Sequence, residues 1–177
     1  MYPYNVKKIE KMAVKTVPFL KNGNRDFNNV LDSITPRQGG FTKGTATVSL
    51  TRAQSGQTII VGPAAAGLAA NATFSLPSAE DGLSFRFEYV GGAADAQDLI
   101  IDTGSDTNFF IGGLLQHDIG GEDGAIYHPD NNSNSKVTVK TPDNGTYITC
   151  YCDGTNWFIN GYVNTATDTG VVFADQP

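Results

Sequence analysis

Short apolar runs, each bounded by turn-forming residues, restrict what this chain can fold into more than any other feature. Four such runs lie between Thr45 and Val90 and are separated by Gly, Pro, Ser, Asn and Asp. In the last of them, residues 83–90, Leu, Phe, Phe and Tyr alternate with Ser, Arg and Glu. A period of two places the apolar side chains on one face of a strand and the polar ones on the other. The stretch therefore predicts consecutive antiparallel strands with one buried face.

The rest of the body continues this pattern of short strands and turns. Gly is abundant, charged residues make up only 17% of the 177 residues, and 40% are hydrophobic, which suits a turn-rich β protein with a core. We expect loops at 62–71 and 91–97 and a long exposed insertion at 112–135, where Gly, Asp and Asn gather. The predicted fold is all-β: an antiparallel β-sandwich of jelly-roll-like character over residues 45–177.

Residues 1–44 are expected to form a long extended N-terminal arm. Three prolines interrupt any helix there, and apolar residues are too few for the segment to fold alone. Its basic residues are Lys7, Lys8, Lys11, Lys15, Lys21, Arg25, Arg37 and Lys43, of which the first seven are assigned to binding a partner.

Charge divides the chain at the end of this arm. Residues 1–43 hold eight Lys and Arg against three Asp and Glu, a balance of +5, so the remainder carries −11 of the net −6. A basic arm on an acidic body indicates that the arm binds something acidic outside its own body, or folds back on that body.

Two segments repeat one pattern of strand, Pro, acidic or amide residue, Gly and strand, at 72–87 and 136–151. Two similar hairpins would supply the two sheets of a sandwich, although shared turn chemistry explains the likeness equally well. A further hairpin is expected around Asp153-Gly154, and Trp157 is expected to anchor the packing. Cys150 and Cys152 are predicted to be reduced, because a disulfide between them within one strand would be strained.

The sharpest catalytic candidate is the turn Asp102-Thr103-Gly104-Ser105, which follows two isoleucines. It resembles the active-site turn of aspartic proteases, in which two such carboxylates share one proton. Asp-Thr-Gly occurs again at residues 168–170, but only the copy at 102–104 follows an apolar pair and precedes Ser, so with this one turn the chemistry would require a homodimer. The same residues are also ordinary chemistry for a turn at a strand end, with Asp and Ser bonded to the local backbone and Gly at positive φ.

A second candidate is an acidic, histidine-containing stretch that could ligate a divalent ion. Its potential ligands are His117, Asp118, Glu122, Asp123, His128 and Asp130. Because no closely spaced His pair is present, a solvated loop is the preferred interpretation, and no metal or cofactor is expected. Nucleophile elbows, P-loops and dinucleotide-binding glycine patterns are absent from the sequence. The chain is therefore not expected to be an enzyme.

The stretch L-T-R-A-Q-S-G-Q-T-I-I-V, followed by A-T-F-S-L-P-S-A-E-D-G-L-S-F-R-F, resembles β domains of tailed-bacteriophage virion proteins. These include head decoration proteins and tail-fibre modules. The later segment C-D-G-T-N-W-F-I-N-G is similar to the same group, and the likeness covers roughly residues 45–163, without the arm.

This resemblance implies a structural role in the virion, assembled in the host cytoplasm. We expect a capsid decoration, or cement, protein whose arm clamps neighbouring major capsid subunits. A tail-fibre or receptor-binding module is the alternative, and a homodimeric aspartic protease using Asp102 is the third. Partners are expected to be the major capsid protein and the chain itself as a homotrimer, with neither nucleic acid nor membrane. Because apolar residues crowd both faces of two strands, the subunit contacts are assigned to Leu99, Ile101, Phe109 and Phe110.

Overall fold

The computed structural model of the chain describes residues 42–44, 47–62, 67–92, 96–121 and 123–176. The predicted arm lies outside these residues except for its last three positions, and so do the seven basic residues from Lys7 to Arg37. What is described is all-β: two mixed sheets and a single 3-10 turn at Arg52–Gln54. The all-β prediction is confirmed.

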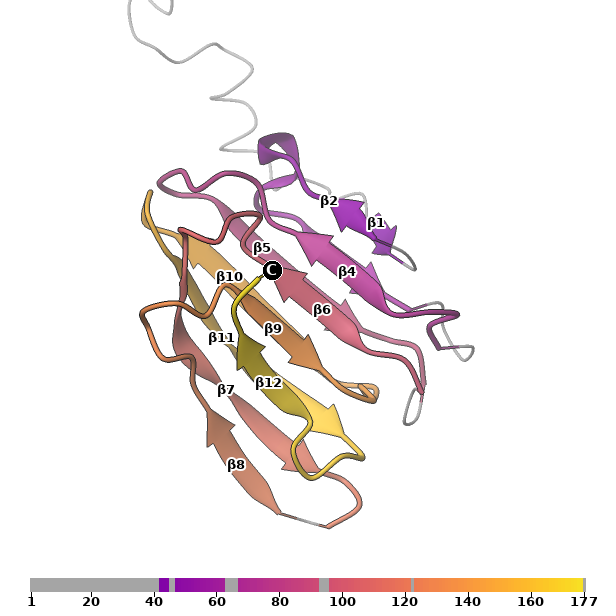
Figure 1. Cartoon of the computed structure of the whole chain (residues 1–177). Coiled ribbons are helices and arrows are strands. Elements are labelled where there is room, and N and C mark those ends of the chain that lie inside the picture. The colour runs from indigo at the N-terminus through magenta and orange to yellow at the C-terminus, as the bar shows by residue number, and fades with distance from the viewer. Residues whose placement is uncertain (1–41, 45–46, 63–66, 93–95, 122, 177) are drawn as a thin grey trace, which may run out of the picture. The chain divides into compact units, whose positions relative to one another are not determined.

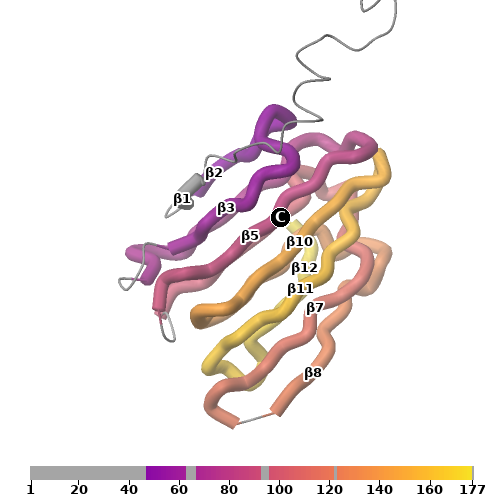
Figure 2. Tube along the Cα trace, turned by 180° about the vertical axis from the view of Figure 1, so that it is seen from behind, coloured from indigo at the N-terminus to yellow at the C-terminus, as the bar shows by residue number. Residues whose placement is uncertain are grey.

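The two sheets lie one in front of the other (Figures 1 and 2). The larger sheet has the strand order β1 (Thr42–Gly44), β3 (Thr58–Val61), β5 (Ser84–Tyr89), β10 (Tyr147–Cys152), β11 (Trp157–Thr165), β7 (Phe110–Asp118) and β8 (Gly124–Tyr127). The smaller sheet has the order β12 (Val171–Ala174), β9 (Lys136–Val139), β6 (Leu99–Asp102), β4 (Ala72–Ser75) and β2 (Val48–Ser49).

The first six strands form a parallel coil rather than the expected antiparallel series. Successive strands alternate between the two sheets, so β1, β3 and β5 are parallel neighbours in one, and β2, β4 and β6 in the other. A chain that crosses to the opposite sheet and returns re-enters the first sheet in its original direction. The runs were placed correctly, but their pairing was wrong, because alternation along a strand does not depend on the direction of its neighbours.

The remaining strands pair mostly in antiparallel fashion. β10 pairs with β5 and β11, β9 pairs with β6 and β12, and β8 pairs with β7, while β7 and β11 are parallel. The expected long insertion at 112–135 is therefore corrected, because most of β7 and all of β8 lie within it. Gly112 and Gly113 hid β7: a Cβ at Gly112 would lie 2.3 Å from the carbonyl oxygen of Ile159, so only glycine fits against β11 there.

The apolar faces of both sheets meet in one core. On β5 the predicted alternation is confirmed, with Phe85, Phe87 and Tyr89 buried and the polar residues between them facing outward. The ring of Phe87 lies 5.4 Å from that of Phe74 on β4, which joins the two sheets directly. Trp157 is fully buried with its ring centroid 5.9 Å from that of Phe85, so its expected role as a packing anchor is confirmed.

The two repeated segments are corners between sheets, not hairpins. The first leads from β4 to β5 and the second from β9 to β10, so each carries the chain from the smaller sheet to the larger. Their glycines, Gly82 and Gly145, both have positive φ, as a sharp corner requires. The hairpin at Asp153-Gly154 is confirmed between β10 and β11.

Three of the four residues assigned to subunit contacts belong to the core of the body itself. Leu99, Ile101 and Phe110 are buried within the single chain, while Phe109 is half-buried in the loop before β7. A side chain without accessible surface is not available to another subunit. The assignment is corrected for these three, because each strand alternates normally and the neighbouring Ile100 and Ile111 take the outward positions.

Candidate functional site

The turn after β6 has the geometry of an ordinary turn at a strand end. One carboxylate oxygen of Asp102 accepts the backbone N–H of Gly104 at 3.0 Å, and the other accepts the hydroxyl of Ser75 at 3.0 Å. The Ser105 hydroxyl accepts the N–H of Thr107, and Gly104 has a φ of 72°. The expected turn chemistry is therefore confirmed: one oxygen of this largely buried carboxylate holds the turn, and the other bonds Ser75 on the neighbouring strand β4.

The acidic stretch after β7 is spread over separate local contacts. His117 lies 3.3 Å from the amide oxygen of Asn164, Asp118 accepts the N–H of Gly120, and His128 is exposed. Glu122 lies outside the described residues, and Asp123 is exposed on the turn before β8. Among the described residues, no group of three His, Cys, Asp or Glu side chains is placed to hold a metal ion.

The carboxyl group of Asp130 has a strongly lowered pKa. Its carboxylate accepts backbone N–H groups of Ser133, Asn132 and Asn134 at 2.9 to 3.0 Å and the Ser133 hydroxyl at 2.7 Å. These hydrogen bonds, led by the backbone N–H of Ser133, hold its pKa far below its ordinary value of 3.8. The ionised carboxylate of Asp130 therefore caps the loop 130–134 that contains it.

The two cysteines are buried and free, as expected. Burial raises the pKa of the Cys150 thiol, and desolvation likewise raises that of Cys152. A thiol that resists ionisation is a poor nucleophile, so both behave as small apolar core residues.

The outward face of the larger sheet holds the most distinctive surface chemistry. We call the outward side chains of β3, β5, β10 and β11 the aromatic face: Thr58, Ile60, Ser84, Arg86, Glu88, Tyr147, Thr149, Tyr151, Phe158, Asn160, Tyr162 and Asn164. Four of the twelve are aromatic, and Arg86 and Glu88 are its two charged members. These two form an ion pair, with 2.7 Å between Arg86 Nε and Glu88 Oε1, so the face has no net charge.

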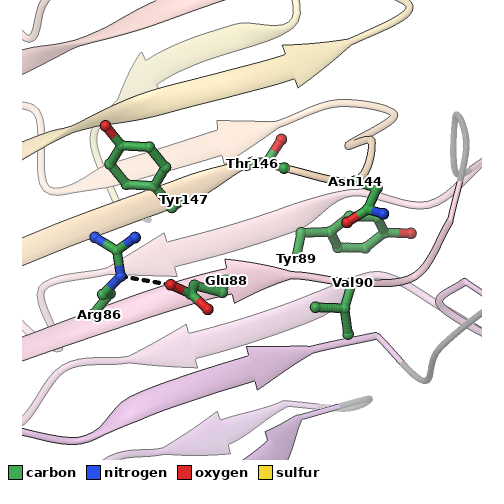
Figure 3. Close-up of a pocket in the computed structure, with 8 residues that line it drawn as sticks. Arg86, Glu88, Tyr89, Val90, Asn144, Thr146 and Tyr147 are labelled. Atoms are coloured by element: carbon green, nitrogen blue, oxygen red, sulfur yellow. Dashed lines mark hydrogen bonds and ion pairs between the residues drawn. The ribbon is translucent and has the colours of Figure 1, made fainter.

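Arg86 stands at the centre of this face, between two clefts. Its guanidinium carbon lies 4.4 Å from the centre of the Tyr147 ring. On one side, a cleft of about 280 Å³ is lined by Arg86, Glu88, Tyr147 and the turn 144–146 (Figure 3). On the other side, a cleft of about 190 Å³ is lined by Arg86, Thr58, Ser84 and Thr149. Both clefts open on the same face and share the arginine.

Beyond the second cleft, two rings form a stacked pair. Tyr151, the neighbour of Ser84 across β5 and β10, stacks on Phe158 with ring centroids 4.8 Å apart and planes 11° from parallel. Tyr147 and Tyr151 are each more than a third exposed. The outward side chains of the smaller sheet differ, since they are mainly Thr, Ser and Lys with Ile100 and Val172. The aromatic face is therefore particular to one side of the body.

Sequence analysis missed this surface. The signal was present as a period of two in Tyr147, Thr149 and Tyr151 and again in Phe158, Asn160 and Tyr162. Their convergence with Arg86 depends on β5, β10 and β11 being neighbours, which local patterns do not state.

In comparisons with family models, with characterised proteins and with solved structures, no match to the chain was found. Within the described residues, no helix has the length and apolar character needed to cross a membrane.

Proposed function

We propose that the chain is a virion structural protein, a capsid decoration protein with a non-catalytic body. In this proposal the two sheets form a β-sandwich of jelly-roll type, and residues 1–44 form an extended arm that clamps neighbouring major capsid subunits. The single observation that carries the proposal is the division of charge along the chain, +5 in residues 1–43 and −11 in the remainder, which suits a basic segment that binds an acidic partner. The closed turn at Asp102 supports a body without catalysis.

Attachment is assigned to the basic residues of the arm. Their excess of +5 is complementary to an acidic surface, and electrostatic attraction between exposed groups weakens with salt. A homotrimer would present three arms at once, and their combined binding would exceed that of one arm without new contacts. Light scattering on the purified chain measures the oligomeric state, and a strict monomer at micromolar concentration contradicts a preformed trimer.

The test is cosedimentation of the chain with particles that lack it. Deletion of residues 1–40 is expected to leave the body folded and to abolish binding to the particle. Replacing Lys7 and Lys8 by Gln should weaken binding and its salt dependence, whereas the matched replacement of Lys136 and Lys140 on the body should not. A truncated body that binds as tightly as the full chain overturns the arm assignment.

A tail-fibre or receptor-binding module is the second candidate, and the aromatic face favours it. Labelling of the chain in purified particles separates the two, because decoration predicts signal over the head and the alternative predicts signal at the tail. The third candidate, a homodimeric aspartic protease, predicts peptide cleavage with an acidic optimum that disappears in Asp102→Asn. We expect no such cleavage, since that carboxylate is engaged in the turn.

A further inference from the structure

We propose that the aromatic face binds a neutral oligosaccharide, laid across the two clefts and the Tyr151–Phe158 pair. This inference goes beyond attachment to a particle and does not depend on it, because the arm and the aromatic face are different parts of the chain. It rests on the shape of the face, on its chemistry and on its charge.

The shape fits an elongated ligand. The two clefts lie on opposite sides of Arg86, and Ser84 at the edge of the second is the cross-strand neighbour of Tyr151. From Glu88 to Ser84 the path follows β5, beside Tyr147 to Tyr151 on the neighbouring strand β10. Four residue spacings along a strand span about 13 Å. That length suits a short oligosaccharide better than a single sugar, and the two clefts provide separate places for consecutive units.

The chemistry fits a ligand that is both apolar and rich in hydroxyl groups. A pyranose ring has flat C–H faces, which pack on aromatic rings, and a rim of hydroxyls, which need hydrogen-bond partners. The terminal nitrogens of Arg86, the Thr149 hydroxyl and the Asn160 amide make no hydrogen bond to other described residues. They line or adjoin the path beside the stacked rings, so one ligand can use both kinds of contact.

The charge argues for a neutral ligand. Glu88 holds Arg86 in an ion pair at 2.7 Å, so this arginine does not offer an unbalanced positive charge to an anion. The remainder of the chain after residue 43 carries a balance of −11, which repels anionic polymers at longer range. Sulfated or otherwise acidic glycans are therefore expected to bind worse than neutral ones of the same length.

A protein partner is the competing occupant, since interfaces also favour Tyr, Phe and Arg. The saccharide is favoured because the polar groups surround two clefts that a flat protein surface would leave unfilled. A buried interface of that kind would leave the donors of Arg86 and Thr149 without partners, which is costly. Self-association through this face would be detected in the test below.

The test uses the full chain on an array of neutral and acidic oligosaccharides, followed by titration calorimetry with the neutral members that bind. Tyr151→Ala and Arg86→Ala are each expected to weaken binding about tenfold or more, since the first removes half of the stacked pair and the second removes the side chain shared by both clefts. Thr138→Ala, an outward residue of the smaller sheet, is the matched control and should bind as the unchanged chain does. Circular dichroism of each variant checks that it is folded.

Two results would overturn the proposal. One is the absence of binding to any neutral oligosaccharide on the array, or binding that Tyr151→Ala and Arg86→Ala leave unchanged. The other is a chain that self-associates in sedimentation through these residues without binding saccharides, which assigns the face to a subunit interface. Cosedimentation of the same variants with particles is expected to be unaffected, so this failure is distinct from failure of the proposed arm.

Discussion

The two halves of the body are built from similar strands but are wound differently. In residues 42–102 the chain alternates between sheets, and every pairing within that half is parallel. In residues 110–174 the pairings are antiparallel, with the exception of β7 and β11. The halves join through β5–β10 in one sheet and β6–β9 in the other, both antiparallel. The difference shows that the connections, rather than the strands, determine the winding.

The boundary between the two differently wound halves is where the aromatic face forms. The aromatic face draws on both halves, with Arg86 and Glu88 from the coil and the aromatic side chains from β10 and β11. It exists because β5 and β10 are neighbours at the boundary between the halves. A surface assembled at such a boundary is sensitive to how firmly the two halves are joined.

The largest expected effects come from paired truncations in the core, one in each half. Phe74→Ala on β4 and Trp157→Ala on β11 each remove a fully buried aromatic ring and should lower the free energy of unfolding by about 3–5 kcal/mol. If the halves fold as one unit, unfolding of Phe74→Ala in urea has coincident midpoints by circular dichroism and by Trp157 fluorescence. Separate midpoints would show that the coil melts independently.

The matched controls are outward residues on the same strands. Thr73→Ala and Asn160→Ala should change the free energy of unfolding by about 0.5 kcal/mol or less, since neither removes buried apolar volume. Trp157→Phe should lie between the control and the alanine variant, because the indole nitrogen has no hydrogen-bond partner in the described structure and only volume is lost.

A smaller effect is expected at Gln116, which ties the sheets together within the second half. This buried side chain on β7 donates to the carbonyls of Thr167 and Asp168 and accepts the N–H groups of Gly170 and Val171, all within 3.0 Å. Gln116→Leu removes these four hydrogen bonds and should lower the free energy of unfolding by about 1–3 kcal/mol. The loss is limited because water can bind some of the backbone groups that Gln116 releases.

Hydrogen exchange distinguishes this loss from a general weakening. In Gln116→Leu the amides of Gly170 and Val171 should exchange faster, while those of β3 and β5 in the coil keep their relative protection. Leu115→Ala, its exposed neighbour on β7, is the matched control. Equal acceleration across both halves would mean that Gln116 supports the whole body rather than this connection.

The smallest effect concerns acid stability and the loop capped by Asp130. Its folded-state pKa is lowered, so ionised Asp130 stabilises the fold above the ordinary value of 3.8, and this contribution is lost as the pH falls below that value. Asp130→Asn should therefore flatten the decline in stability between about pH 4 and pH 2. Thermal unfolding across that range measures the slope. An unchanged slope would show that the loop cap does not contribute to acid sensitivity.

Sequence patterns predicted individual strands and turns but missed features that depend on which strands are neighbours in a sheet. Alternation in residues 83–90 identified β5 and its buried face, and the chemistry of Asp102 and Gly104 identified the turn. Parallel winding was missed because a strand has the same period of two whichever way its neighbour runs. β7 and β8 were missed because Gly112 and Gly113 imitate a loop and because Ile126 on the edge strand is 65% exposed.

The candidate site divides in the same way. The apolar residues of β6 were assigned to subunit contacts because two adjacent isoleucines suggest two buried faces, whereas Ile100 is an outward residue of an ordinary strand. The aromatic face could not be assembled without the strand order. Its residues come from four strands that span more than a hundred positions of the chain.

The coil also determines how the body tolerates changes in length. Val48 pairs with Phe74, 26 residues later, Ala72 with Leu99 after 27, and Thr58 with Arg86 after 28. An inserted stretch of that size, with one strand for each sheet, would widen both sheets by one strand and leave every other pairing in register. A single residue inserted within a strand would instead turn the core side chains that follow it outward. Length in this half is therefore tolerated in whole turns of the coil, which offers a way to graft additional surface beside the existing clefts.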